Sequence, residues 1–419
     1  MQSFWRFFKL DAPYLMSGGA WTSLSFLVSA LASLTTMVAF GNLLPRDTFG
    51  TYNYLLSLGA SLSFLTLSGA SPAVMRAVAR GYESVIPAAL RMQLKYNAGA
   101  MAIILMASLY YGYMGNSLFA ISLAILVLAY PVAESFHIYK SVLTGRKRFD
   151  TLTKATSAVS LIGAVITVVT LILTDNILIL IAIYTAMSLI PNIIIYRRVA
   201  GNVEESGPDN EQVKEMRRTS FHFTGAGIIG IIASYIDKII LFQVAGPVAL
   251  AVYGFALAGP ERFKSLIKNW GSIALPRLAQ KSLGQVRQVI YKHIAFSLLV
   301  GISLTIIYWL IAPILFKLFL PLYLDSILYS QVMAISLITV PISVYIGSIF
   351  ASQNMLRATY TLNFGNHIAR IALFVVCGYL WQIWGLVAAS IISSLINAIY
   401  GLAIWEVEAR RLLKIQQHE

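Results

Sequence analysis

The feature that most constrains this chain is the recurrence of apolar windows about 20 residues long, the length of helix that crosses a bilayer. Only 11% of the residues are charged, whereas a soluble protein carries roughly 25%. The sequence therefore predicts an all-α, polytopic integral membrane protein. The twelve windows that we predict as spans lie at roughly 16–40, 52–75, 97–113, 118–140, 153–173, 177–196, 220–243, 250–273, 292–313, 326–351, 360–380 and 384–405.

The basic residues are distributed unevenly between the two sides of these spans. With the N-terminus placed inside, 24 of the 31 Lys and Arg residues fall in inner loops and tails, two in outer loops and five within spans. Positive charge concentrates in the cytoplasmic loops of membrane proteins. The pattern therefore predicts an even number of spans with both termini cytoplasmic. The same bias accounts for the net charge of +14 without any nucleic-acid partner.

One long polar linker, at 197–218, separates six predicted spans from six. We expect an N-terminal six-helix bundle at 1–200, a cytoplasmic linker at 201–218 and a C-terminal six-helix bundle at 219–419. Each half contains a turn and then a helix with a Gly/Tyr opening, PRDTFGTYNYLLSLGA in the first and GPVALAVYGFALAGPERF in the second. Because six is even, both halves start on the same side, which predicts parallel repeats related by a pseudo-two-fold axis along the membrane normal.

Four stretches carry a resemblance to a known family, and their order along the chain matters more than any one of them. They are NLLPRDTFGTYNYLLSLGASLSFLTLSGAS, the basic loop LTGRKRF, SYIDKIILFQVAGPVALAVYGFA and the exit LPRLAQ. Together with the six-plus-six layout, the chain resembles the polysaccharide flippases of the multidrug/oligosaccharidyl-lipid/polysaccharide exporter superfamily. It departs from their pattern at AVYG, where the family tends to place Gly before Tyr.

The resemblance implies a function and a setting. Such flippases carry undecaprenyl-diphosphate-linked oligosaccharides to the outer leaflet of the bacterial inner membrane by alternating access, for O-antigen, lipopolysaccharide, capsule or exopolysaccharide synthesis. The cargo head would pass through a central polar cavity while its tail stays in lipid. The implied partners are the lipid-linked oligosaccharide, membrane lipid, a polysaccharide polymerase and a chain-length regulator. Coupling to a proton or sodium gradient is implied by the superfamily.

Charged residues within the C-terminal spans are the candidates for a cavity that accepts an anionic head. Arg and Lys neutralise phosphate, Arg through its planar fork and Lys as a point charge. Residues spaced three or four apart share one face of a helix, as Lys264 and Lys268 do with Glu261, and as Asn363, His367 and Arg370 do in the eleventh span. A snorkelling surface helix is the alternative for the eighth span, and an isolated histidine is more often structural. The predicted substrate-binding residues are Arg262, Lys264, Lys268, Arg370, Lys238, His367 and Asn363.

Acidic residues within the spans are candidates for ion coupling or for charge pairing. Asp237 and Lys238 are adjacent, so they point about 100° apart and do not face each other. Asp237 therefore requires a partner on another helix, and it either binds the coupling ion or ties spans seven and eight together. Glu134 and His137 follow Pro131 at helical spacing, and they either relay protons or stabilise the Pro131 bend. Glu261 completes the predicted set.

Hydroxyl side chains form one stripe along the first span. They either pack helices closely or line the predicted cavity. The stripe consists of Thr22, Ser25, Ser29, Ser33 and Thr36.

Catalytic and cofactor-binding motifs are missing from the sequence. There is no Walker loop, HExxH, CxxC or GxSxG pattern, and one cysteine, Cys377, cannot build a metal cluster or an internal disulfide. We therefore expect a protein that is not an enzyme and needs no cofactor or metal. An ion-coupled drug or metabolite antiporter of the same superfamily is the alternative, although five basic against three acidic span residues favour an anionic cargo. A membrane glycosyltransferase or polymerase would need a larger outer loop than the one predicted near 313–325.

Overall fold

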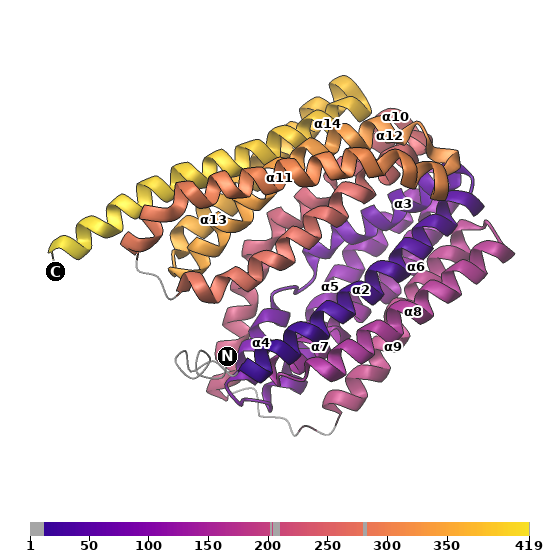
Figure 1. The fold of residues 1–419 in the computed structure, drawn as a ribbon. Coiled ribbons are helices and arrows are strands. Elements are labelled where there is room, and N and C mark those ends of the chain that lie inside the picture. Colours follow the sequence, from indigo (N-terminus) through magenta and orange to yellow (C-terminus); the bar gives the residue numbers. More distant parts are fainter. Residues whose placement is uncertain (1–11, 202, 204–209, 280–282, 419) are drawn as a thin grey trace. The chain divides into compact units, whose positions relative to one another are not determined.

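In the computed structural model, residues 12–201, 203, 210–279 and 283–418 are described, and among them there is no β-strand (Figure 1). This confirms the prediction of an all-α membrane protein. The first half contains α2 (Ala12–Leu43), α3 (Arg46–Ser61), η1 (Leu62–Leu65), α4 (Ala70–Ala79), α5 (Val85–Tyr113), α6 (Ser117–Phe136), α7 (Ile138–Gly145), α8 (Phe149–Leu173) and α9 (Ile177–Ala200). The second contains α10 (Glu211–Ala279), α11 (Leu283–Phe319), η2 (Pro321–Tyr323), α12 (Ser326–Ala334), η3 (Ile335–Ile338), α13 (Val340–Ser352) and α14 (Leu356–His418).

Two of these elements are pairs of helices joined at a kink. In α10 the break is at Gly246, with φ 79° and ψ −176°, and in α14 it is at Gln382, with φ 50° and ψ −125°. Glycine adopts the first of these conformations at little cost because it has no Cβ. The breaks fall where the sequence places gaps between predicted spans.

Within the described residues, eight helices are long and apolar enough to cross a membrane, or nine if α3–η1 and α4, bent by 60°, form one span. The kinked helices α10 and α14 are each long enough to form two spans.

The chain divides into two compact units whose boundaries lie within helices. Unit 1 holds Met1–Pro45 and Leu58–Ile228, and unit 2 holds Arg46–Ser57 and Ile229–Glu419. The start of α3 thus belongs to unit 2, and the start of α10 belongs to unit 1. The boundaries at 200 and 219 that we expect from the sequence concern the two six-span repeats of the chain, and they remain a prediction.

Unit 1 is organised around α4, α5 and α7. Its buried core includes Val74, Ile86 and Tyr139, with Met216 contributed by the first turns of α10. Next to this core, α2 packs along α8. The hydroxyl stripe of the first span makes that contact, because Ser25 pairs with Thr156 at 2.9 Å and Ser29 with Ser160 at 3.2 Å. These hydroxyls therefore pack helices.

Unit 2 has a core cluster where α11, α13 and α14 meet, around Ile290, Ile346 and Trp405. The beginning of α3 is held in this unit by an ion pair of 2.8 Å between Arg46 Nη1 and Asp325 Oδ2. The Arg46 guanidinium also lies 5.0 Å from the centre of the Tyr323 ring.

Candidate functional site

Asp237 lies in a hairpin formed by the two halves of α10. The bend at Gly246 returns the helix on itself, and the Tyr253 hydroxyl donates a hydrogen bond of 2.7 Å to Asp237 Oδ2. The exposed fractions are 2% for Asp237 and 0% for Tyr253. The other carboxylate oxygen, Oδ1, is buried and has no hydrogen-bond partner in the described part of the chain. Among the described residues, spans seven and eight are thus joined at Asp237 by a hydrogen bond from the Tyr253 phenol, and not by a salt bridge.

Tyr253 was not among the residues singled out from the sequence. The sequence does indicate this residue. Asp237 is nine residues before the turn at Gly246 and Tyr253 is seven residues after it, so both lie at a similar distance from the turn. A search limited to charged residues overlooks such a neutral hydrogen-bond donor.

Arg370 and His367 lie on the first half of α14, one turn apart. The Arg370 guanidinium stacks over Phe374, 5.0 Å from the ring centre. Its Nε atom is buried and has no hydrogen-bond partner among the described residues, and the same holds for Nδ1 of His367. Electrostatic interactions connect Arg370 with Tyr253, Glu261 and His367. A buried polar atom without a hydrogen-bond partner is costly. Each of these two side chains therefore has one atom available for a hydrogen bond with a ligand.

The eighth span contributes the remaining charges of this region. Lys264 Nζ donates to Glu261 Oε1 at 2.9 Å, with the lysine side chain largely buried and that of the glutamate half exposed. Glu261 also interacts electrostatically with Lys268 and Arg370. We call the connected residues of unit 2 the charged cluster. It comprises Asp237, Tyr253, Glu261, Lys264, Lys268, His367 and Arg370.

Three other predicted residues differ in their exposure. Lys238 is half-buried beside Asp237, and Arg262 and Asn363 are exposed. The His367 ring also packs closely on α10, where a Cβ added to Gly230 would lie 3.0 Å from His367 Nε2. Helix contact thus explains part of the position of His367.

Glu134 and His137 form a separate pair in unit 1. His137 Nδ1 lies 3.1 Å from Glu134 Oε2 where α6 ends, and Lys140 interacts electrostatically with the same carboxylate. The carbonyl of Pro131 is satisfied from elsewhere, by the amide of Asn97 and the hydroxyl of Ser135, both at 2.9 Å. The pair therefore closes the end of the helix, and the buried Asn97 secures the proline bend.

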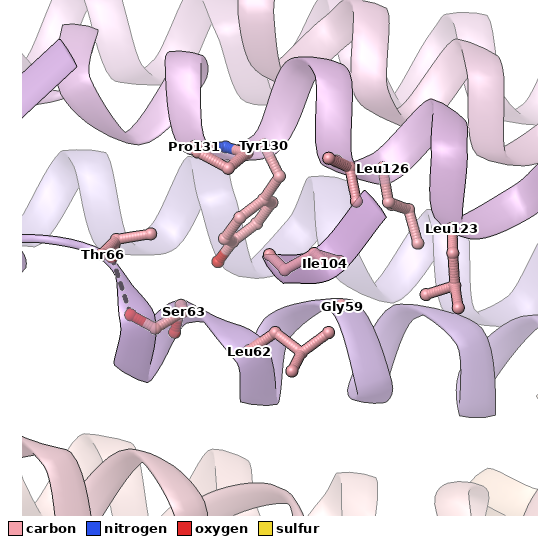
Figure 2. A pocket seen from close by; sticks show the side chains of 10 residues that line it. Gly59, Leu62, Ser63, Thr66, Ile104, Leu123, Leu126, Tyr130 and Pro131 are labelled. Carbon is pink, nitrogen blue, oxygen red and sulfur yellow. Dashed lines mark hydrogen bonds between the residues drawn. The ribbon is translucent and has the colours of Figure 1, made fainter. Parts of the chain in front are cut away.

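A small cavity lies beside this bend, within unit 1 (Figure 2). Leu62, Ile104, Leu126 and Tyr130 point into it, and Thr66 closes one side with a hydrogen bond of 2.7 Å to the Ser63 carbonyl. Its volume of about 10 Å³ accommodates roughly one water molecule. No charged side chain lines it, so it is not a place for a large anionic head.

Comparisons with solved structures show that this architecture is shared with proteins described as transporters. The outward-facing conformation of a multidrug resistance MATE family transporter of the MOP superfamily is similar to this chain with a TM-score of 0.65, 14% identity and 96% of each chain covered. An inward-facing conformation described in the same terms has a TM-score of 0.67 and 14% identity, covering 92% of this chain and 96% of the other. A MOP superfamily transporter from Pyrococcus furiosus, described as having a binding pocket of reverse polarity, has a TM-score of 0.61 and 13% identity, covering 94% and 95%.

These likenesses show that the chain shares its fold with transporters described as members of the MOP superfamily. The family model of the polysaccharide biosynthesis proteins matches residues 15–258, more than half of the chain. The protein belongs to this family, which confirms the resemblance noted from its motifs. No curated protein matches the chain in sequence.

Proposed function

We propose that this protein is a flippase for undecaprenyl-diphosphate-linked oligosaccharide. It carries the cargo from the cytoplasmic to the outer leaflet of the inner membrane by alternating access, with both termini in the cytoplasm. The products serve O-antigen, capsule or exopolysaccharide synthesis, and a polymerase and a chain-length regulator act on them afterwards. The family match supports this proposal, as does the six-plus-six layout predicted from the sequence, with bundles expected at 1–200 and 219–419 and a linker at 201–218.

The observation that carries the proposal is the composition of the charged cluster. Three cations, Lys264, Lys268 and Arg370, accompany two carboxylates. The Arg370 Nε atom is buried without a partner, and a guanidinium in this state suits a phosphate oxygen. A buried polar atom without a hydrogen-bond partner is costly, so we infer that an anion provides that partner for Arg370 Nε.

Asp237 is the candidate for coupling to an ion gradient. Its Oδ2 atom is bound by Tyr253, while its Oδ1 atom is buried and free of hydrogen bonds from the described residues. A carboxylate with one unused oxygen in a low-dielectric region gains from a proton or a small cation. Glu134, paired with His137, is a second candidate for proton coupling.

The test is surface glycan in a strain that lacks the chromosomal gene and carries a plasmid copy. Arg370→Gln and Lys264→Gln should each reduce surface glycan at least tenfold, while the amount of protein in the membrane stays unchanged. Lys292→Gln, on an exposed residue of α11 outside the charged cluster, is the matched control and should retain full activity. Normal glycan in both cluster variants would refute the cationic site.

A drug antiporter is the second candidate, favoured by the multidrug transporters that share the fold. The polarity of the binding pocket differs between members of this fold, as the description of the Pyrococcus protein states. Purified protein in vesicles separates the two functions. A flippase transfers a fluorescent lipid-linked oligosaccharide between leaflets and leaves cationic dyes where they are, whereas an antiporter does the reverse.

A further inference from the structure

An open groove runs between α8 and α9 in unit 1, and none of its lining residues belongs to the charged cluster. It encloses about 430 Å³, which is within the size range of small-ligand sites. Large apolar side chains on its edges, such as Ile162 and Ile194, are exposed. The apolar residues that line the groove include Ala155, Ala158, Ile162, Met187, Pro191 and Ile194.

The recess results from local sequence. Ala155 and Ala158 lie one turn apart on α8 and leave space where larger residues would fill the contact with α9. Opposite them, Pro191 within α9 lacks an N–H, so the helix cannot make its regular hydrogen bond there. The Asn192 amide bonds the Ser188 carbonyl in the same turn. The alanines on α8 leave space that no side chain fills, and the proline interrupts the regular hydrogen bonding of α9 beside it.

Both charged residues of the groove, Lys154 and Arg198, lie at one end of it. Lys154 is in the first turns of α8 and Arg198 in the last turn of α9, and the two helices are antiparallel because only Thr174–Asn176 connects them. Among the residues that the structure describes, no acidic side chain lines the groove. Lys154 Nζ lies 5.7 Å from the ring centre of Trp21 on α2. Tryptophan, lysine and arginine together are typical of the headgroup level of a bilayer.

The length of the groove suits one leaflet. From Lys154 to Ile162 the α8 wall rises about 12 Å, and from Arg198 back to Met187 the α9 wall descends about 16 Å. The hydrocarbon core of a bilayer is about 30 Å thick, so one leaflet takes up about half of that. A phospholipid acyl chain matches this length, whereas a long polyprenyl chain exceeds it.

We propose that this groove is a binding site for an anionic phospholipid of the cytoplasmic leaflet. Its phosphate lies between Lys154 and Arg198, and one acyl chain follows Ala155, Ala158 and Ile162 toward the middle of the membrane. Basic pockets between transmembrane helices on the cytoplasmic side recognise anionic headgroups. The site lies outside the charged cluster, so it does not depend on the proposed cargo.

Binding is tested with the full-length protein in detergent, by native mass spectrometry against phosphatidylglycerol and phosphatidylcholine of the same acyl chains. The wild type should bind phosphatidylglycerol at least tenfold more tightly than phosphatidylcholine. Lys154→Gln combined with Arg198→Gln should weaken phosphatidylglycerol binding by about thirtyfold, since each charge near a lipid phosphate contributes roughly fivefold. Lys95→Gln combined with Arg197→Gln changes the net charge equally on exposed residues outside the groove and should bind as the wild type does.

A second measurement uses the fluorescence of Trp21, which lies beside Lys154. The Trp21 contribution is the difference in fluorescence between the wild type and Trp21→Phe. Phosphatidylglycerol with brominated acyl chains should quench this contribution more than brominated phosphatidylcholine does. The proposal is overturned if the two lipids bind the wild type equally, or if the groove double variant binds as the control does. Binding of undecaprenyl phosphate in place of phosphatidylglycerol, with the same loss in the double variant, would also overturn it by assigning the groove to the carrier lipid.

Discussion

At the scale of single residues, the molecule balances buried charge with neutral partners as well as ionic ones. The Asp237 carboxylate, 2% exposed, is held by a phenol from the next helix. Asn97 binds the backbone N–H of Leu67 at 3.0 Å and the carbonyl of Pro131 at 2.9 Å, so that one amide secures two breaks in helices. Neutral hydrogen-bonding groups recur at these breaks because an unsatisfied backbone group in a membrane costs several kcal/mol.

The Tyr253 hydroxyl provides a prediction at this scale. Tyr253→Phe leaves both oxygens of Asp237 without a donor, so we expect a destabilisation of about 1–3 kcal/mol and a lower midpoint of thermal unfolding. Tyr323→Phe is the matched control, because Tyr323 is also fully buried but its hydroxyl has no hydrogen-bond partner among the described residues. Equal midpoints for the two variants would show that the bond to Asp237 contributes nothing.

At the scale of elements, short connections are fixed by charged side chains that bind backbone. Arg146, which follows α7, makes a two-point contact with Glu83, at 2.8 Å from Nε to Oε1 and 2.7 Å from Nη2 to Oε2. Its Nη1 atom donates to the carbonyl of Val199 near the end of α9, at 2.7 Å. One side chain therefore joins the turn before α5, the turn after α7 and the end of α9.

This clamp predicts a pH dependence of stability. The hydrogen bond from Arg146 lowers the pKa of Glu83 below its ordinary value of 4.5. The clamp therefore contributes above about pH 4.5, and its contribution is lost as the pH falls through the lower pKa of the folded state. Glu83 is 43% exposed, so the contribution at neutral pH is at most about 1 kcal/mol.

Thermal unfolding of the wild type and Glu83→Gln at pH 7 and at pH 3 measures this effect. The wild type should be the more stable at pH 7, and the difference should shrink at pH 3. Glu215→Gln, which breaks a pair with Arg80 in which both side chains are about 60% exposed, should have a smaller effect. A difference that grows on acidification would contradict the assigned role of the clamp.

At the scale of the whole molecule, charge distribution determines orientation. The 24 basic residues assigned to inner loops and tails exceed the two assigned to outer loops, and this difference predicts which ends of the helices face the cytoplasm. The breaks at Gly246 and Gln382 preserve that orientation, since each returns the chain to the side from which it came.

Cysteine labelling tests the orientation. In a Cys377→Ala background, Glu211→Cys at the start of α10 should react with a membrane-impermeant maleimide only after permeabilisation of the inner membrane. Asp175→Cys, in the turn between α8 and α9, should react in intact cells whose outer barrier admits the reagent. Both positions are exposed. The reverse pattern would invert the topology.

The sequence by itself determined the class of fold and the family, whereas the predicted spans at 52–75 and 326–351 are broken helices in the structure. Windows of apolar residues and the turn at Gly246 depend on local chemistry, namely the transfer of side chains into lipid and the conformational freedom of glycine. Only the tertiary structure decided which side chains meet. Tyr253 as the partner of Asp237, Ser25 and Ser29 as contacts to α8, and the unit boundaries within α3 and α10 depend on which helix faces pack together. Such contacts join residues far apart in the chain, and periodicity within one helix does not specify the helix that it faces.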